Sequence, residues 1–313
     1  MNKLLKMKKL CSVLFLAGAL VFCSCATTGT VPITGRKQRL LVSDEQVLSL
    51  SNQQYQQYMQ TAKASANAAN TAMVKRVGQR LANAVVAYLN ANGMGSEASE
   101  YKWEFNLVQD QNVNAFCMPG GKIVVYEGLL PVTRDEASLA VVLGHEIAHA
   151  VAKHSAERLS NQMRQQYGSQ ILSSVLTGSG ASTGLQQLGT TVFGLGSNLG
   201  SAAYSRKQES EADHLGLIFA AMAGYDPQVA VSFWQRMSQS TGGGSSSLFS
   251  DHPSDANRIS NIKGWMPEAL KYCQGGNASG VTGSGQRATM PQTVKTIHIS
   301  SGGSSQSAAK HRK

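Results

Sequence analysis

The stretch VVLGHEIAHA, residues 141–150, constrains this chain more than any other feature of its sequence. His145 and His149 are four residues apart, and on a helix two such side chains project from the same face. The surrounding residues are apolar, as a core helix requires and a solvated helix would not show. The stretch therefore predicts a buried helix that carries two imidazoles and the carboxylate of Glu146. The segment TRDE, residues 133–136, has the form of a capping box and is expected to open this helix.

Two imidazoles at this spacing can chelate one metal ion, and Glu146 is about 100° round the helix from His145. Zinc lowers the pKa of a bound water toward ~7, and a nearby carboxylate can take its proton as the water attacks a carbonyl. The pattern H-E-x-x-H is therefore typical of metalloproteases. The same pattern also occurs in ordinary buried helices with hydrogen-bonded histidines, so the assignment depends on a third ligand.

The third ligand is expected downstream, in YSRKQESEADHLG. Glu209 and Asp213 are four residues apart, which suits a carboxylate ligand followed by an acid that accepts a hydrogen bond from a ligating histidine. Glu211 is expected to face away. His154 lies nine residues after His145, half a turn out of phase on a continuing helix, and is expected to be structural. Taken alone, the stretch around Glu209 is more typical of a charged, solvated helix than of a metal site.

Four segments in order resemble the gluzincin zinc metallopeptidases of the HtpX, CAAX prenyl protease and BepA-like family. They are VNAFCMPGGKIVVYEGLL, H-E-x-x-H, E-x-x-x-D and DHPSDANRI, and the resemblance covers about residues 70–265. It implies an α+β, zincin-like domain, mainly helical with a small mixed sheet. It also implies one Zn²⁺ per chain held by His145, His149 and Glu209, with Glu146 as the base and Asp213 supporting a ligand.

The resemblance assigns roles to the two remaining segments. The residues GGKIVVYEG would form the edge strand of the active-site cleft and pair with an extended substrate. His252 would approach the metal, either to donate a hydrogen bond to the oxyanion or to occupy the open metal position and close the enzyme. Arg258 is expected to be structural, and Asn114 and Phe116 to shape the turn before the strand. The predicted substrate-strand residues are Ile123, Val124, Val125 and Tyr126.

The predicted function is a zinc-dependent endopeptidase of the bacterial cell envelope that acts on unfolded or damaged envelope proteins. The family's membrane-bound members have several spans, and no comparable apolar segment follows the N-terminal run of this chain. A helical-repeat array after residue 270 is also missing from the sequence. Two alternatives stay open: a latent protease-fold module that binds or chaperones proteins, and a zinc hydrolase that cleaves a cell-wall amide.

The N-terminus predicts export. Four lysines without an acid precede the apolar run LCSVLFLAGALVF, which is typical of a secretory signal peptide, residues 1–24. Cys25 follows small residues as in a bacterial lipobox, although Phe22 stands where leucine is usual, and its lipid would tether the protein to the periplasmic face of the outer membrane. An uncleaved anchor is the alternative.

The rest of the chain is expected to consist of a linker (25–42), the peptidase domain (43–273) and a disordered, Gly/Ser-rich basic tail (274–313). Between residues 25 and 273 there are 19 basic and 18 acidic residues, so the basic character belongs to the two ends and does not indicate nucleic-acid binding. A capping box at Ser43–Gln46 predicts a first helix. Residues 168–203 are expected to form a mobile loop or short helices, and Cys117 and Cys273 could form a disulfide.

Overall fold

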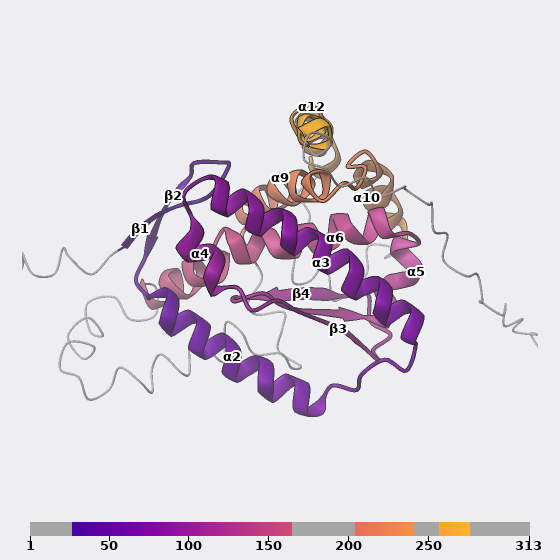
Figure 1. Cartoon of the computed structure of the whole chain (residues 1–313), viewed down its shortest axis with the longest axis horizontal. Helices are drawn as coiled ribbons and strands as arrows, with labels where there is room; N and C mark the ends of the chain where they lie inside the picture. The colour runs from indigo at the N-terminus through magenta and orange to yellow at the C-terminus, as the bar shows by residue number, and fades with distance from the viewer. Residues whose placement is uncertain (1–26, 165–203, 241–256, 276–313) are drawn as a thin grey trace, which may run out of the picture.

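The computed structural model describes residues 27–164, 204–240 and 257–275 (Figure 1). Cys25, His252, the segment 168–203 and nearly all of the tail lie outside these ranges. The described part is mainly helical with two small sheets, which confirms the predicted α+β class. None of the described helices has the length and apolar character needed to cross a membrane.

The elements follow one another in this order: β1 (Thr27–Thr30), β2 (Lys37–Leu40), α2 (Asp44–Thr61), α3 (Ala68–Ala91), α4 (Gly95–Glu100), β3 (Glu104–Val108), β4 (Ala115–Met118), β5 (Lys122–Tyr126), η2 (Glu127–Leu129), α5 (Leu130–Thr133), α6 (Glu136–Val151), α9 (Arg206–Met222), α10 (Val229–Ser240) and α12 (Arg258–Gly275).

The second sheet is mixed, with strand order β3-β5-β4. β5 pairs in parallel with β3 and antiparallel with β4, and all five of its residues are buried. The prediction that Ile123–Tyr126 forms the edge strand is therefore wrong, because β5 is the central strand. Gly120 and Gly121, both at φ 86°, fold β5 back on β4, and β3 covers its other side. Within the described sheet, the edge next to α6 is β4.

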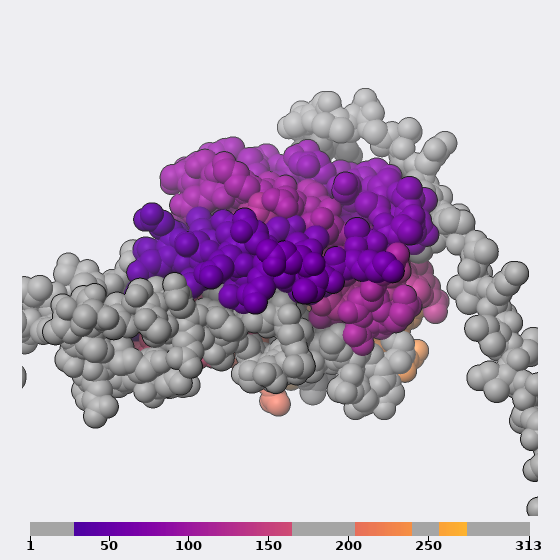
Figure 2. Space-filling model, turned by 90° about the horizontal axis from the view of Figure 1, so that it is seen from below, coloured from indigo at the N-terminus to yellow at the C-terminus, as the bar shows by residue number. Residues whose placement is uncertain are grey.

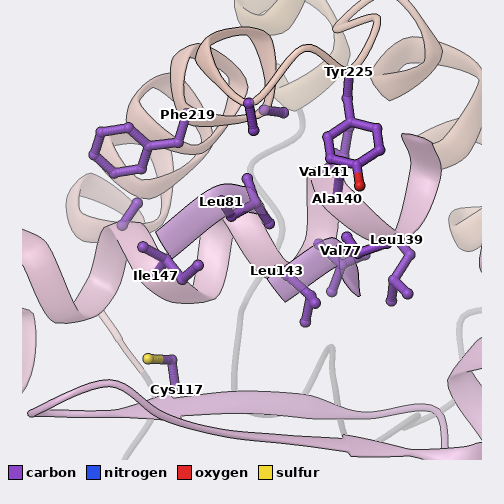
Figure 3. Close-up of a cluster of buried hydrophobic side chains, with 14 of the residues drawn as sticks. Val77, Leu81, Cys117, Leu139, Ala140, Val141, Leu143, Ile147, Phe219 and Tyr225 are labelled. Atoms are coloured by element: carbon purple, nitrogen blue, oxygen red, sulfur yellow. The ribbon is translucent and has the colours of Figure 1, made fainter. Parts of the chain in front are cut away.

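The sheet lies between two helical layers (Figure 1). Ile123 and Val125 of β5 pack into the main core with α3, α6 and α9, whereas Val124 and Tyr126 pack on the opposite face with α2. Figure 3 shows the main core, in which Cys117 projects from the sheet toward the helices. Figure 2 shows the atoms of α2 spread across the opposite face of the molecule. This two-sided burial accounts for the continuous apolar run of β5.

α6 and α9, the two helices that carry the motifs, pack closely together. The approach is closest at two glycines: a Cβ added to Gly144 would lie 2.6 Å from the carbonyl oxygen of Gly216, and one added to Gly216 would lie 2.6 Å from the amide nitrogen of His145. Because neither residue has a side chain, the two backbones meet directly. This contact joins two helices whose facing glycines are 72 residues apart in sequence (216 − 144).

The strands β1 and β2 form a hairpin that packs on the domain. Val31 in its turn is 1% exposed, and the side-chain amide of Gln38 donates to the carbonyl of Ala152 at 2.7 Å. Residues 27–42 therefore belong to the folded unit, and the predicted linker over this range is wrong. Only the contacts of this segment with the rest of the chain show that it is folded.

Smaller predictions had mixed outcomes. The capping box of Ser43 and Gln46 is confirmed at the start of α2. The box predicted at residues 133–136 is wrong, because Asp135 is the N-cap of α6 and accepts from the amide of Ser138. Both Cys117 and Cys273 are free, so the possible disulfide is not formed.

Candidate metal centre

Three predicted ligands meet in the interior. His145 and His149 lie on α6 and Glu209 lies on the first turn of α9, and the ligand atoms of all three lie within 4.8 Å of one another. The two Nε2 atoms are 3.1 Å apart, and the Glu209 carboxylate oxygens are 3.4 Å from His145 Nε2 and 3.5 Å from His149 Nε2. Zinc bonds of about 2.0–2.1 Å at tetrahedral angles separate donor atoms by about 3.4 Å. The donor set therefore fits a small tetrahedral cation.

The position of Glu209 is set by how α9 begins. Ser205 caps the helix and accepts from the amide of Gln208, whose side chain in turn accepts from the amide of Ser205. This reciprocal pair fixes the first turn, and Glu209 is the next residue along. Glu209 is 1% exposed, so its carboxylate is directed into the protein and not toward solvent.

Asp213 supports His145, as its spacing from Glu209 suggested. Its Oδ1 lies 2.9 Å from His145 Nδ1. Because Nε2 of the same ring faces the other two ligands, Nδ1 carries the proton and donates it to Asp213. Burial lowers the pKa of His145, but Asp213 and Glu209 outweigh burial and raise this pKa to about 10. The same negative charge would favour a cation held among these groups.

Arg258 is part of the site, which the sequence-based assignment to a structural role did not anticipate. Its Nε donates to Asp213 Oδ2 at 2.7 Å, and its Nη2 donates to Asp213 Oδ1 at 2.9 Å and lies 3.5 Å from Glu209 Oε2. The guanidinium also stacks on Trp234, 3.7 Å from the ring centre. Burial raises the pKa of Asp213, but Arg258 and His145 lower it overall and keep the carboxylate ionised. The signal in the sequence was a single basic residue in DHPSDANRI.

Glu146 follows His145 on α6 and is 2% exposed. Burial raises the pKa of the Cys117 thiol well above its usual value, and the nearby Glu146 carboxylate adds to this shift. α6, which carries Glu146, packs on β4, the edge strand that carries Cys117.

His154 lies beside the ligand His149, although its spacing on a continuing helix predicted that it would lie on the opposite face. α6 ends at Val151, and Lys153 turns the chain with φ 52° before residues 154–164 resume a helix. The nine-residue phase argument was therefore wrong, since it assumed one continuous helix. His154 Nδ1 lies 3.0 Å from His149 Nδ1, on the side of that ring away from the other ligands. His154 is not among the three groups that could hold the ion.

Glu211 was expected to face away from Glu209, and its carboxylate points toward the N-terminal hairpin. Its Oε2 lies 2.9 Å from His154 Nε2. Thr34 and Arg36 of the hairpin also donate to its carboxylate, each at 2.7 Å. Burial raises the pKa of Glu211, but the hydrogen bonds from His154, Arg36 and Thr34 outweigh burial and lower it to about 2. Burial dominates at His154 and lowers its pKa, so this imidazole is neutral.

A buried centre of two histidines and one carboxylate, held by two crossed helices beside a small mixed sheet, defines a zincin-like metallopeptidase domain. The chain belongs to peptidase family M48, whose model matches residues 68–266. This confirms the resemblance that the four motif segments indicated. Membership of a metallopeptidase family also implies a bound metal ion, in keeping with the donor set described above.

Relatives come from organelles and from bacteria. The chain is 40% identical to the mitochondrial metalloendopeptidase OMA1 of Schizosaccharomyces pombe over 177 residues, 56% of this chain and 50% of the relative. It is 29% identical to the metalloprotease LoiP of Escherichia coli over 232 residues, 73% of this chain and 84% of the relative. It is 30% identical to the beta-barrel assembly-enhancing protease of Yersinia pestis over 183 residues, 58% and 36% of the two chains. The chain spans about half the length of the mitochondrial relatives from S. pombe and Bos taurus.

Proposed function

We propose that the chain is a zinc-dependent endopeptidase of the bacterial cell envelope. In this proposal His145, His149 and Glu209 hold one Zn²⁺ and Glu146 is the catalytic base. The observation that carries it is the set of separations, 3.1 to 3.5 Å, among two buried imidazole nitrogens and the two oxygens of one buried carboxylate, donors of the type that zinc prefers. Relatives named metalloendopeptidase and metalloprotease support the same activity.

The bound zinc would act as a Lewis acid that polarises the scissile carbonyl and acidifies the attacking water. Glu146 would accept the proton of that water on a carboxylate oxygen and pass it to the departing amine. Asp213 holds the Nδ1 proton of His145 and so keeps Nε2 available as a ligand. Arg258 would balance the charge of the buried acids without competing for the ligand position, because its short contacts are to Asp213.

We assign the substrate-pairing strand to β4. It is the edge strand of the described sheet that packs against α6, so an extended polypeptide paired with Ala115–Met118 would run beside the metal-binding helix. Main-chain pairing of this kind accepts many sequences but requires an unfolded segment. Unfolded or damaged envelope proteins are therefore the proposed substrates, and the name of the Yersinia pestis relative, beta-barrel assembly-enhancing protease, supports an envelope substrate.

The proposed location follows from the N-terminus. Residues 1–24 would be a lipoprotein signal peptide, and lipid on Cys25 would hold the domain at the periplasmic face of the outer membrane. The peptidase domain would extend through residue 273, with the hairpin of residues 27–42 added at its start, and a basic tail would follow. His252 keeps its two proposed roles, as an oxyanion donor or as a group that closes the site.

The test is zinc content and casein cleavage by the full chain, beside Glu146→Gln and Glu209→Ala. We expect one zinc per wild-type chain, a Glu146→Gln variant that keeps zinc but loses cleavage, and a Glu209→Ala variant that loses both. Glu268→Gln is the control, because this partly exposed carboxylate contacts only His214 among the described partners. One equivalent of zinc without cleavage would favour a latent module, with His252 as the next residue to change. Cleavage of peptidoglycan fragments but not casein would favour an amidase.

A further inference from the structure

We propose that His154 and Glu211 are positioning residues for the ligand His149, and that the N-terminal hairpin holds them in place through Thr34 and Arg36. This inference rests on the proposed zinc site and concerns how the second of its two imidazoles is oriented. It makes the hairpin, which lies outside both metal-binding motifs, a determinant of metal affinity.

The contacts form a continuous chain of hydrogen bonds. His149 Nδ1 is 3.0 Å from His154 Nδ1, and His154 Nε2 is 2.9 Å from Glu211 Oε2. The Glu211 carboxylate then accepts from Thr34 Oγ1 and from Arg36 Nε, each at 2.7 Å. The chain starts at a metal ligand and ends on the hairpin, with His154 fully buried in its middle.

The protons in this chain can be assigned only one way if His149 ligates through Nε2. Its Nδ1 must then carry the proton and donate it to His154 Nδ1. His154 must carry its own proton on Nε2 and donate it to Glu211, which accepts because it is ionised. Each donor meets one acceptor, and the tautomer of His149 that leaves Nε2 available is the tautomer that the chain selects.

The two ligating histidines are thus supported differently. His145 donates directly to the carboxylate of Asp213, whereas His149 reaches the carboxylate of Glu211 through a second imidazole. Asp213 and Glu211 lie on the same helix, α9, which also supplies the ligand Glu209. One helix therefore orients both imidazoles of α6 and provides the third ligand.

The hairpin holds in place the residues that support His149. Arg36 makes a paired contact with Glu157, Nη1 to Oε1 at 2.7 Å and Nη2 to Oε2 at 2.9 Å, while its Nε holds Glu211. Glu157 lies on the same helical segment as His154, so one guanidinium ties that segment to α9. A planar guanidinium with five donors can make both contacts at once, which a lysine ammonium cannot do with the same geometry.

The experiment measures the zinc affinity of the full chain by competition with a chelator, together with the visible absorption spectrum of the Co²⁺-substituted protein. The test variants are His154→Phe, which removes the acceptor, and His154→Asn, whose side-chain oxygen can replace Nδ1 as the acceptor. We expect His154→Phe to weaken zinc binding by about 10- to 100-fold and to change the Co²⁺ spectrum. We expect His154→Asn to recover most of the affinity and the wild-type spectrum.

The hairpin is tested with Arg36→Met against Lys37→Met, its neighbour, which contacts only Thr30 among the described residues. Arg36→Met should weaken zinc binding and Lys37→Met should not, and this pair keeps the test usable if His154→Phe does not fold. Unchanged affinity and spectrum in both His154→Phe and Arg36→Met would overturn the inference while the proposed function stands. A wild-type chain without zinc would overturn both.

Discussion

The contact between α6 and α9 leads to a quantitative prediction for Gly216→Ala. A Cβ at residue 216 would lie 2.6 Å from the amide nitrogen of His145 and 2.8 Å from the carbonyl carbon of Gly144. These are backbone atoms of a neighbouring helix, so no side chain can rotate away to make room. The two helices must therefore move apart at Gly144 and Gly216. This movement would increase the distance between Glu209 on α9 and His145 on α6.

The size of the shift follows from contact distances. Ordinary contact begins at 3.4 Å, so α9 must move by about 0.8 Å from the amide of His145. Zinc sites tolerate deviations of about 0.2 Å in ligand distances, so a shift of this size exceeds what the centre can absorb without rearrangement. We expect Gly216→Ala to weaken zinc binding at least tenfold and to lower the free energy of unfolding by about 1–3 kcal/mol, as overpacked cores do.

The assay is zinc affinity by chelator competition and urea unfolding of the metal-free chain. The control is Gly264→Ala on α12, where an added Cβ meets no described atom within 4 Å. Gly264→Ala should leave zinc affinity unchanged and stabilise by about 0.5–1 kcal/mol, because alanine loses less backbone entropy than glycine in a helix. Wild-type zinc affinity in Gly216→Ala, with the protein folded, would refute the argument that this crossing sets the position of Glu209.

Three further predictions follow from individual contacts. Asp213→Asn should reduce zinc affinity by about 10- to 100-fold in the same chelator competition, because the proton of His145 loses its ionised acceptor; unchanged affinity would contradict this role. Glu211→Gln should lower the free energy of unfolding of the metal-free chain at neutral pH, as measured with urea. The difference in this free energy between variant and wild type should become smaller as pH falls from about 4.5 toward 2, because a carboxyl group with a lowered pKa stabilises the fold only while it is ionised. In native protein mapped by mass spectrometry, iodoacetamide should label half-buried Cys273 before Cys117, whose pKa burial raises well above its usual value; faster labelling of Cys117 would argue against its position beneath α6.

Local pattern was enough to predict the helices that carry the motifs. The apolar flanks of His145 and the i,i+4 pair of Glu209 and Asp213 are periodic features of one helix each, and periodicity needs no knowledge of the rest of the chain. The structure brings these residues together as the resemblance implied. What joins the two helices is a pair of glycines, Gly144 and Gly216, which the sequence contains but which only the crossing explains.

The predictions that were wrong concern features that depend on more than one helix or strand. Ile123–Tyr126 was expected at the sheet edge because the family resemblance implied that position. In the structure β5 has a second neighbour, β3, which comes from an earlier segment of the chain. His154 was expected on the opposite face because nothing in its neighbourhood announces that Lys153 adopts a positive φ. A lysine there carries no turn signal, since glycine and asparagine are the residues that usually accept this conformation.

The hairpin shows why a domain boundary predicted from the sequence can cut through a functional contact. Residues 27–42 were expected to be a linker, and a domain that began at residue 43 would lack both Thr34 and Arg36. Their carboxylate partners, Glu211 and Glu157, would then be left partly buried without the cation that compensates them. Removing one partner of a buried ion pair costs more than the pair contributes, because the remaining charge is uncompensated. The folded unit therefore begins at the hairpin, and the hydrogen bonds that orient His149 begin at the same hairpin.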